Sequence, residues 1–283
     1  MRGLLVLDKC VFQGTTLDRL RGFIGDHYVV LPYALCVECL MSEASDNSGT
    51  AKDPAVLLAK LDKLVKAGAH VGYASCVLLR MEKEQLNAAK TIVDEGSTQR
   101  AQEGMATLHS DFLAVEAETC RRTFEPRISW LQEYGRTYFE NVKKKGLCRE
   151  FRGDCEVYDV KRFDKWLQVA DAAKAAITQT LFPEISASIG NDWYSWQMAR
   201  ILWAWVIDWA CRRNYSGSSF EKRDISNDLH DMEYVAYLSR ADGIITRDKK
   251  LVAPLARAAF PEKDVYSSLE EVPDSYRCDW AAG

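Results

Sequence analysis

Short apolar runs at the two ends of the chain flank a long middle with helical spacing. Near the N-terminus, residues 3–8 and 27–31 are apolar without alternation, which is typical of strands buried on both faces of a parallel sheet. A helix is expected over residues 15–24. Pro32 fits the first turn of another helix that runs to about residue 43. The N-terminal segment therefore alternates strands and helices.

The middle of the chain shows a different pattern. From Pro54 to about Arg213, apolar residues recur at helical spacing, and no repeat period is visible. The pattern predicts helices over residues 54–67, 77–94, 98–123, 127–145, 160–181 and 192–212.

Beyond residue 215 the alternation of strands and helices returns. We expect helices over residues 227–240 and 249–259, and strands over residues 243–246 and 265–266. Because both ends of the chain share this pattern, we predict an α/β fold with a small parallel sheet. In this prediction, residues 1–44 and 215–283 form one discontinuous domain, and residues 45–214 form an all-helical insertion or cap.

Composition indicates a globular cytoplasmic protein. Of the 283 residues, 47% are hydrophobic and 28% are charged, and no apolar run of about 18 residues could form a membrane span. The apolar stretch at the N-terminus is too short for a signal peptide. Nine scattered cysteines favour free thiols in a reducing compartment. Cys36 and Cys39 have CxxC spacing, but they lie in an apolar helical pattern and are interpreted as buried small residues.

Two other features each allow two interpretations. The formal net charge of -4 gives no overall basic footprint, yet residues 143–162 contain a local basic run. This run is either a solvated surface or a surface that follows a nucleic-acid backbone. Residues 191–210 contain five tryptophans, which either pack in a core or form a stacking platform for bases.

Five carboxylates occupy positions that deserve a chemical explanation. Asp8 ends a buried strand, and Glu38 lies in an otherwise apolar helix. Asp228 and Asp231 are three residues apart on one expected helix, and Asp248 follows an expected strand. Local explanations exist, since Asp228 or Asp248 could cap a helix and Glu38 could pair with a Lys or Arg. Lone buried charges nevertheless cost several kcal/mol unless they are paired or bind a metal.

A shared site would explain these acids together. Asp8 and Asp248 both follow strands, and ligands of open α/β sheets bind outside the carboxyl ends of the strands. Converging carboxylates repel one another unless a hard cation such as Mg²⁺ or Mn²⁺ neutralises them. Such a cluster suits phosphodiester hydrolysis, because bound metals activate water and stabilise charge on the leaving oxygen.

The order of these motifs resembles that of the PIN domain nucleases. The stretches that resemble the family are LLVLD at residues 4–8, ALCVE at 34–38, NDLHD at 227–231 and ITRD at 245–248. The resemblance implies that Asp8, Glu38, Asp231 and Asp248 bind the metal and are catalytic. It also implies Asp228 as an auxiliary ligand. Thr246 is implied either to position a ligand or to contact a substrate phosphate. Arg247, Lys249 and Lys250 are the other implied substrate contacts.

The function implied by this resemblance is that of a nuclease dependent on Mg²⁺ or Mn²⁺. Members of the family are most often endoribonucleases, and some are toxins of toxin–antitoxin pairs, so RNA is expected rather than DNA. The resemblance does not extend to the helical middle, which is a candidate surface for a protein partner. No membrane association is expected.

Three alternatives remain open. The chain could be a PIN-like scaffold without activity that serves as a regulatory or protein-interaction module. It could be a phosphatase with an Asp nucleophile, but that chemistry needs a second acid where Cys10 stands. The helical middle could be the functional part, with the α/β ends as its support.

Overall fold

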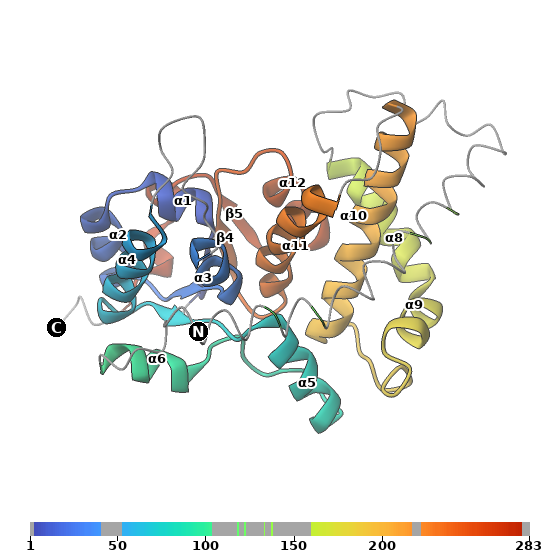
Figure 1. Cartoon of the computed structure of the whole chain (residues 1–283), viewed down its shortest axis with the longest axis horizontal. Coiled ribbons are helices and arrows are strands. Elements are labelled where there is room, and N and C mark those ends of the chain that lie inside the picture. The colour runs from blue at the N-terminus through green and yellow to red at the C-terminus, as the bar shows by residue number, and fades with distance from the viewer. Residues whose placement is uncertain are drawn as a thin grey trace.

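A five-stranded parallel sheet forms the centre of the molecule (Figure 1). The computed structural model describes residues 3–40, 53–103, 160–216 and 222–278, with isolated residues between 118 and 137. The strand order is β3-β2-β1-β4-β5, and each neighbouring pair is parallel. The α/β class predicted from the sequence is therefore confirmed. The strands are β1 (Leu5–Leu7), β2 (Val29–Leu31), β3 (His70–Val71), β4 (Gly243–Ile245) and β5 (Asp264–Tyr266).

Strand β1 joins the two ends of the chain. It pairs with β2 on one side and with β4 on the other, so Leu5 lies opposite both Val29 and Gly243. All residues of β1, β2 and β4 are buried, which explains their continuous apolar sequences. At Gly243 an added Cβ would lie 3.0 Å from the carbonyl oxygen of Asp264, so β5 approaches β4 closely at this glycine.

Helices on the N-terminal side follow each strand in turn. α3 packs against α4, which also contacts α2 and α6. Asp53 caps α4 by accepting a hydrogen bond from the backbone of Ala55, with Pro54 in the first turn. The helices are α1 (Lys9–Gly14), α2 (Leu17–Asp26), α3 (Tyr33–Leu40), α4 (Pro54–Lys66), α5 (Ser75–Gln85) and α6 (Glu95–Gln102).

The rest of the described chain is mostly helical. Helix α8 packs against α10 and α12, and α10 also contacts α5, α9 and α11. In the described part of the chain, no helix is long and apolar enough to cross a membrane. The helices are α8 (Val160–Ala172), α9 (Lys174–Leu181), α10 (Tyr194–Ser216), α11 (Lys222–Ala236) and α12 (Val252–Ala259).

The structure differs from the sequence-based expectation in several elements. The helix expected over residues 77–94 ends at Gln85, where Leu86 adopts a left-handed conformation with a φ of 50°. The two-residue strand β3 lies within the segment expected to be helical throughout, and it extends the sheet beyond β2. The helix expected over residues 160–181 is divided into α8 and α9. Helix α11 begins at Lys222, so Asp228 lies inside it and the helix-cap interpretation of Asp228 is wrong. The helix expected over residues 127–145 and the basic run up to residue 159 lie outside the described residues.

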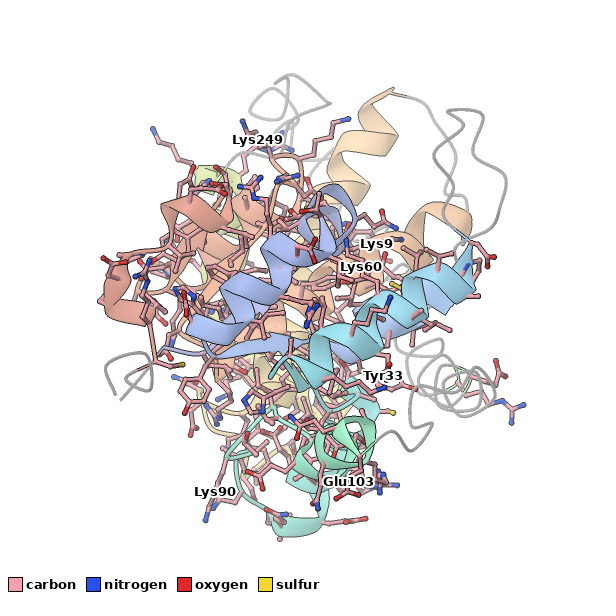
Figure 2. The ribbon with its side chains drawn as sticks, turned by 90° about the vertical axis from the view of Figure 1, so that its left-hand side faces the viewer. Lys9, Tyr33, Lys60, Lys90, Glu103 and Lys249 are labelled. Atoms are coloured by element: carbon pink, nitrogen blue, oxygen red, sulfur yellow. The ribbon has the colours of Figure 1, made fainter. Side chains whose placement is uncertain are left out.

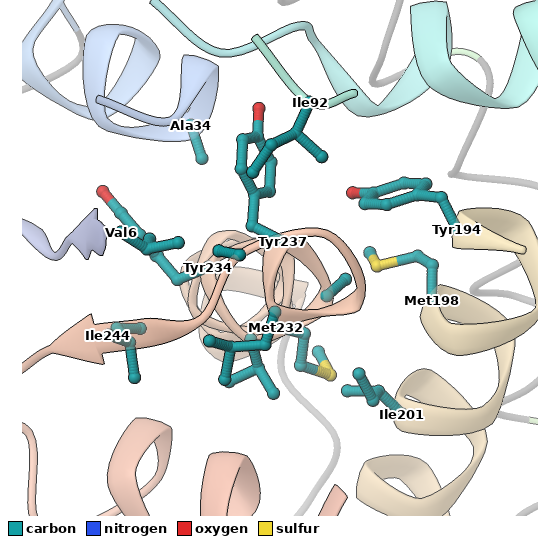
Figure 3. Packing of buried hydrophobic residues seen from close by; sticks show 14 of the residues in the cluster. Val6, Ala34, Ile92, Tyr194, Met198, Ile201, Met232, Tyr234, Tyr237 and Ile244 are labelled. Carbon is teal, nitrogen blue, oxygen red and sulfur yellow. The ribbon is translucent and has the colours of Figure 1, made fainter. Parts of the chain in front are cut away.

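Four tryptophans in α10 and in the turn before it lie in the core. Trp193, Trp196, Trp203 and Trp205 are each at most 4% exposed, which confirms the packing interpretation for these four. Figure 3 shows Tyr194, Met198 and Ile201 of α10 facing Met232 of α11 and Tyr237 of the following 3₁₀ turn (Tyr237–Ser239). One continuous apolar cluster includes these residues and the strands of the sheet. The helical middle therefore shares its core with the sheet.

A buried carboxylate fixes the start of α10. Glu82 of α5 is fully buried, and its two oxygens accept hydrogen bonds of 2.8 Å from the backbone N–H groups of Tyr194, Ser195 and Ala89. The first N–H groups of a helix lack partners within the helix, and a negative charge there is favourable. Glu82 thus ties α5 and the loop after it to α10.

Candidate active site

Asp8 stands where β1 turns into α1. Its backbone carbonyl accepts the N–H groups of Val11 and Phe12 and so starts the helix. The side chain is 3% exposed, and its Oδ2 accepts hydrogen bonds from Thr246 Oγ1 and from Cys10 Sγ at 2.9 Å. Within the described residues, Oδ1 of Asp8 accepts no hydrogen bond. The carboxylate is therefore held firmly by one oxygen at the carboxyl edge of the sheet.

The surroundings of Asp8 favour its protonated form. Burial raises the pKa of Asp8, and the hydrogen bonds from Cys10 and Thr246 offset part of this shift. The negative charges of Glu38 and Asp248 raise the pKa of Asp8 further. Asp8, Glu38 and Asp248 come from three distant segments, and Asp8 lies close enough to the other two for their charges to act on it.

Glu38 approaches this site from α3. Its Oε1 lies 3.1 Å from Nζ of Lys9, and its Oε2 accepts a hydrogen bond of 2.6 Å from the hydroxyl of Tyr234. The pairing of Glu38 with a lysine, one of the two possibilities open from the sequence, is therefore present. Burial and the charges of Glu38 and Asp8 raise the pKa of Tyr234 well above its ordinary value, so its hydroxyl remains a donor.

Asp248 lies in the turn after β4. Its Oδ1 accepts backbone hydrogen bonds from Lys250 at 2.6 Å and Leu251 at 3.0 Å, and its own N–H donates to Thr246 Oγ1 at 3.0 Å. The carboxylate thus shapes the turn that leads to α12, which begins at Val252 rather than at Lys249. Asp248 has this structural role and also acts electrostatically on Asp8.

Helix α11 brings His230 to the site and carries Asp231 next to it in the chain. His230 and Asp231 are both partly exposed and lie one helical turn before Tyr234, the partner of Glu38. His230 Nδ1 lies 3.0 Å from Oε2 of Glu233. Burial opposes protonation of His230, but the hydrogen bond and charge of Glu233, with the charge of Glu38, raise its pKa above the ordinary value. Asp231 shares this turn of α11 with His230, and the side chain of Asp228 lies outside the described residues.

The expected substrate contacts divide into two kinds. Thr246 is 2% exposed and donates to Asp8, so it positions the carboxylate. Arg247 is exposed, but its guanidinium donates to the carbonyl of Gly14 at 3.3 Å, at the end of α1. Lys249 and Lys250 are exposed, and Figure 2 shows Lys249 at the outer edge of the molecule. The two exposed lysines are thus available to a substrate, whereas the guanidinium of Arg247 is bonded to the end of α1.

The sequence did not indicate four side chains of the site: Lys9, Cys10, His230 and Tyr234. Lys9 and Cys10 directly follow Asp8, so the first turn of a helix beginning there brings them to the same place. Burial and the charge of Asp8 raise the pKa of Cys10 to about 12, so its thiol is a hydrogen-bond donor and not a nucleophile. Cys36 and Cys39 are buried free thiols, as expected.

The acids suit a hard divalent cation by their chemistry. Asp8, Glu38 and Asp248 offer oxygen atoms only, and the repulsion of Asp8 by the other two is of the kind that a cation relieves. Among the described residues, however, no three His, Cys, Asp or Glu side chains are grouped so as to hold a metal ion. In this arrangement Glu38 contacts the ammonium group of Lys9.

Comparisons with protein-family models, with curated proteins and with solved structures found no match for this chain. The function must therefore be argued from the site itself.

Proposed function

We propose that this chain is a metal-dependent nuclease that hydrolyses phosphodiester bonds, with RNA as the preferred substrate and Mg²⁺ or Mn²⁺ as the cofactor. The observation that supports the proposal is the buried carboxylate of Asp8 at the carboxyl edge of a parallel sheet, where the charges of Glu38 and Asp248 act on it. Ligand sites of such sheets lie at this edge, and a buried carboxylate with a raised pKa beside other acids is typical of functional sites. The proposal also rests on the resemblance of the motif order to PIN domain nucleases.

In this proposal the side chains have distinct roles. Asp8, Glu38, Asp231 and Asp248 would hold the cation, which would lower the pKa of an attacking water and stabilise charge on the leaving oxygen. Thr246 and Cys10 hold Oδ2 of Asp8 and leave Oδ1 available. Tyr234 orients Glu38 through its hydroxyl. Lys249 and Lys250 would contact phosphates of the substrate.

The direct test is cleavage of single-stranded RNA and DNA with Mg²⁺, Mn²⁺ or EDTA. We expect the wild-type chain to cleave RNA only when a metal is present. Asp8→Asn should lower the rate by at least about 100-fold, since even residues behind the ligands contribute 10- to 100-fold. Asp18→Asn, which removes an exposed acid from α2, is the matched control and should retain the wild-type rate. Equal rates for Asp8→Asn and wild type would contradict the proposal.

A PIN-like scaffold without activity is the second candidate. The observation in its favour is the ion pair between Lys9 and Glu38, together with the lack of a three-ligand group among the described side chains. Such a module would bind a protein or RNA partner, with the helical middle as the candidate surface. The same cleavage assay separates the two candidates, because a scaffold would cleave no RNA with either metal.

A further inference from the structure

Lys9 places a positive charge inside the group of acids. It is the first residue of α1, so the turn that positions Asp8 also fixes the start of the Lys9 side chain. Its Nζ lies 3.1 Å from Glu38 Oε1, and among the described residues Glu38 is its only hydrogen-bond partner. The side chain is 30% exposed and Glu38 is 14% exposed, so the pair lies at the boundary between the core and solvent.

The charge of Lys9 reaches several groups of the site. Its positive charge acts to lower the pKa of His230 on α11 and the pKa of Cys39 on α3. Other causes outweigh this effect, and both pKa values lie above their ordinary values. Lys60 acts on Cys39 as well, but its Nζ donates to the carbonyls of Phe12 and Thr15 at the end of α1. Figure 2 shows Lys9 and Lys60 on the same face of the molecule. Lys9 forms its ion pair with an acid of the site, Glu38.

We propose that Lys9 is an internal cation that occupies Glu38 in the metal-free protein and competes with the divalent metal for this carboxylate. This inference rests on the proposed function, because it requires that a metal binds at the site. Glu38 is partly buried beside Asp8, so without a metal its charge needs a partner, and Lys9 supplies one. A cation that approaches Oε1 of Glu38 must displace the ammonium group, which lies within direct contact distance.

Competition between Lys9 and the metal should weaken the binding of the metal. Two ligands that exclude one another at a shared group are linked, and each weakens the other by the same factor. Removal of the Lys9 charge should therefore tighten metal binding, whereas a lysine that contacted substrate phosphate would leave metal affinity unchanged. Loss of the ion pair also removes the lysine charge from beside Glu38 in the metal-free state, so a variant without this charge should gain more stability from metal than wild type.

The experiment is a calorimetric titration of the full chain with Mn²⁺ alone, for wild type, Lys9→Gln, Lys9→Arg and Lys90→Gln. Lys90 is exposed and lies far from Lys9 in Figure 2, so Lys90→Gln controls for the change in net charge. We expect Lys9→Gln to bind Mn²⁺ about fivefold more tightly or better, the lower end of typical coupling between linked binding events. Lys9→Arg and Lys90→Gln should bind as wild type does.

Melting temperatures in EDTA and in Mn²⁺ give a second readout for the same variants. Lys9→Gln should melt below wild type in EDTA and show the larger rise on addition of Mn²⁺. If wild type binds Mn²⁺ and Lys9→Gln binds it no more tightly, the competition is refuted while the metal site stands. If no variant binds Mn²⁺, the proposed function and this inference both fail.

Discussion

At the scale of single residues, the buried carboxylate of Asp8 lowers the stability of the fold when it is ionised. Burial and the charges of Glu38 and Asp248 raise the pKa of Asp8 in the folded chain, so its ionised form is disfavoured there. A raised carboxyl pKa means that the folded state loses stability as the pH rises from the ordinary value of 3.8 through the folded-state pKa. Above that window the ionised Asp8 destabilises the fold at every pH.

Asp8→Asn should therefore stabilise the metal-free protein at pH 7. An amide can still accept the hydrogen bonds of Thr246 and Cys10, and it removes the repulsion from the other acids. We expect a gain on the order of 1 kcal/mol in the free energy of unfolding, a usual size for one buried substitution. Urea unfolding in EDTA measures it.

The pH dependence of this gain provides the control. As the pH falls towards 3.8, wild-type Asp8 takes up its proton and the difference between the two proteins should shrink. Asp18→Asn should show no such gain at pH 7. A variant that is less stable than wild type at pH 7 would show that the Asp8 carboxylate contributes more to the fold than its surroundings indicate.

Glu82 presents the opposite case, because hydrogen bonds from the backbone stabilise its negative charge. Its oxygens accept three backbone N–H groups, two of them at the start of α10. Glu82→Gln should lower the free energy of unfolding by about 2 kcal/mol, since the amide turns an N–H donor towards N–H groups and the hydrogen bonds lose their charge. Chemical denaturation tests this, with the exposed Glu84→Gln of the same helix as the matched control. Equal losses for the two variants would contradict this role.

The sequence identified the acids of the site better than their neighbours. A carboxylate after an apolar strand is visible in any sequence, because burial of a lone charge is costly. The ion pair between Lys9 and Glu38 depends on two segments 29 residues apart, and the bond between Tyr234 and Glu38 on segments 196 residues apart. No local pattern specifies such pairs, so Lys9 and Tyr234 emerged only from the structure.

At the scale of elements, length determined which parts could be predicted. Strands β1, β2 and β4 were expected because continuous apolar runs bounded by polar residues identify them. The two residues of β3 give no periodicity, and only their pairing with β2 makes them a strand. The start of α11 was placed five residues late, at 227 rather than 222, because its first residues are polar.

Helix α2 contains a glycine whose replacement should stabilise the fold. Gly22 lies in the middle of α2 on its exposed side, and an added Cβ would meet nothing within 4 Å. Gly22→Ala should raise the free energy of unfolding by about 0.5–1 kcal/mol, because alanine loses less backbone entropy in a helix. Thermal unfolding measures this.

Gly68 is the contrasting position. It follows α4 with a φ of +114°, a conformation that side chains of L-residues rarely adopt. Gly68→Ala should therefore destabilise the chain, although its added Cβ would also meet open space apart from one contact at 3.9 Å with Ile24. If both glycine variants change stability in the same direction, backbone conformation is not what distinguishes them.

At the scale of the whole molecule, the helical middle and the sheet form one packed unit. A single apolar cluster extends from Leu5 of β1 to Trp203 of α10. Arg200 of α10 donates to the carbonyl of Ala259 in α12 at 3.2 Å and to the carboxylate of Asp171 in α8 at 3.1 Å. The site is built by α1, α3, α11 and the end of β4, and α10 packs directly against α11. The described helices of the middle therefore support the element that holds His230 and Tyr234.

Because they share a core, the sheet and the helical middle should unfold together as one cooperative unit. In hydrogen exchange followed by mass spectrometry, the most protected amides of β1 and α10 should open with free energies within about 1 kcal/mol of each other. Ile207 of α10 is fully buried, and Ile207→Val should lower both values together by about 1 kcal/mol. A separate cap would behave differently, because α10 would open at lower free energy and Ile207→Val would leave β1 unchanged. If Ile207→Val lowers the opening free energy of β1 as much as that of α10, then substitutions on α10, far from the acids, also destabilise the site. They would act through α11, which packs against α10.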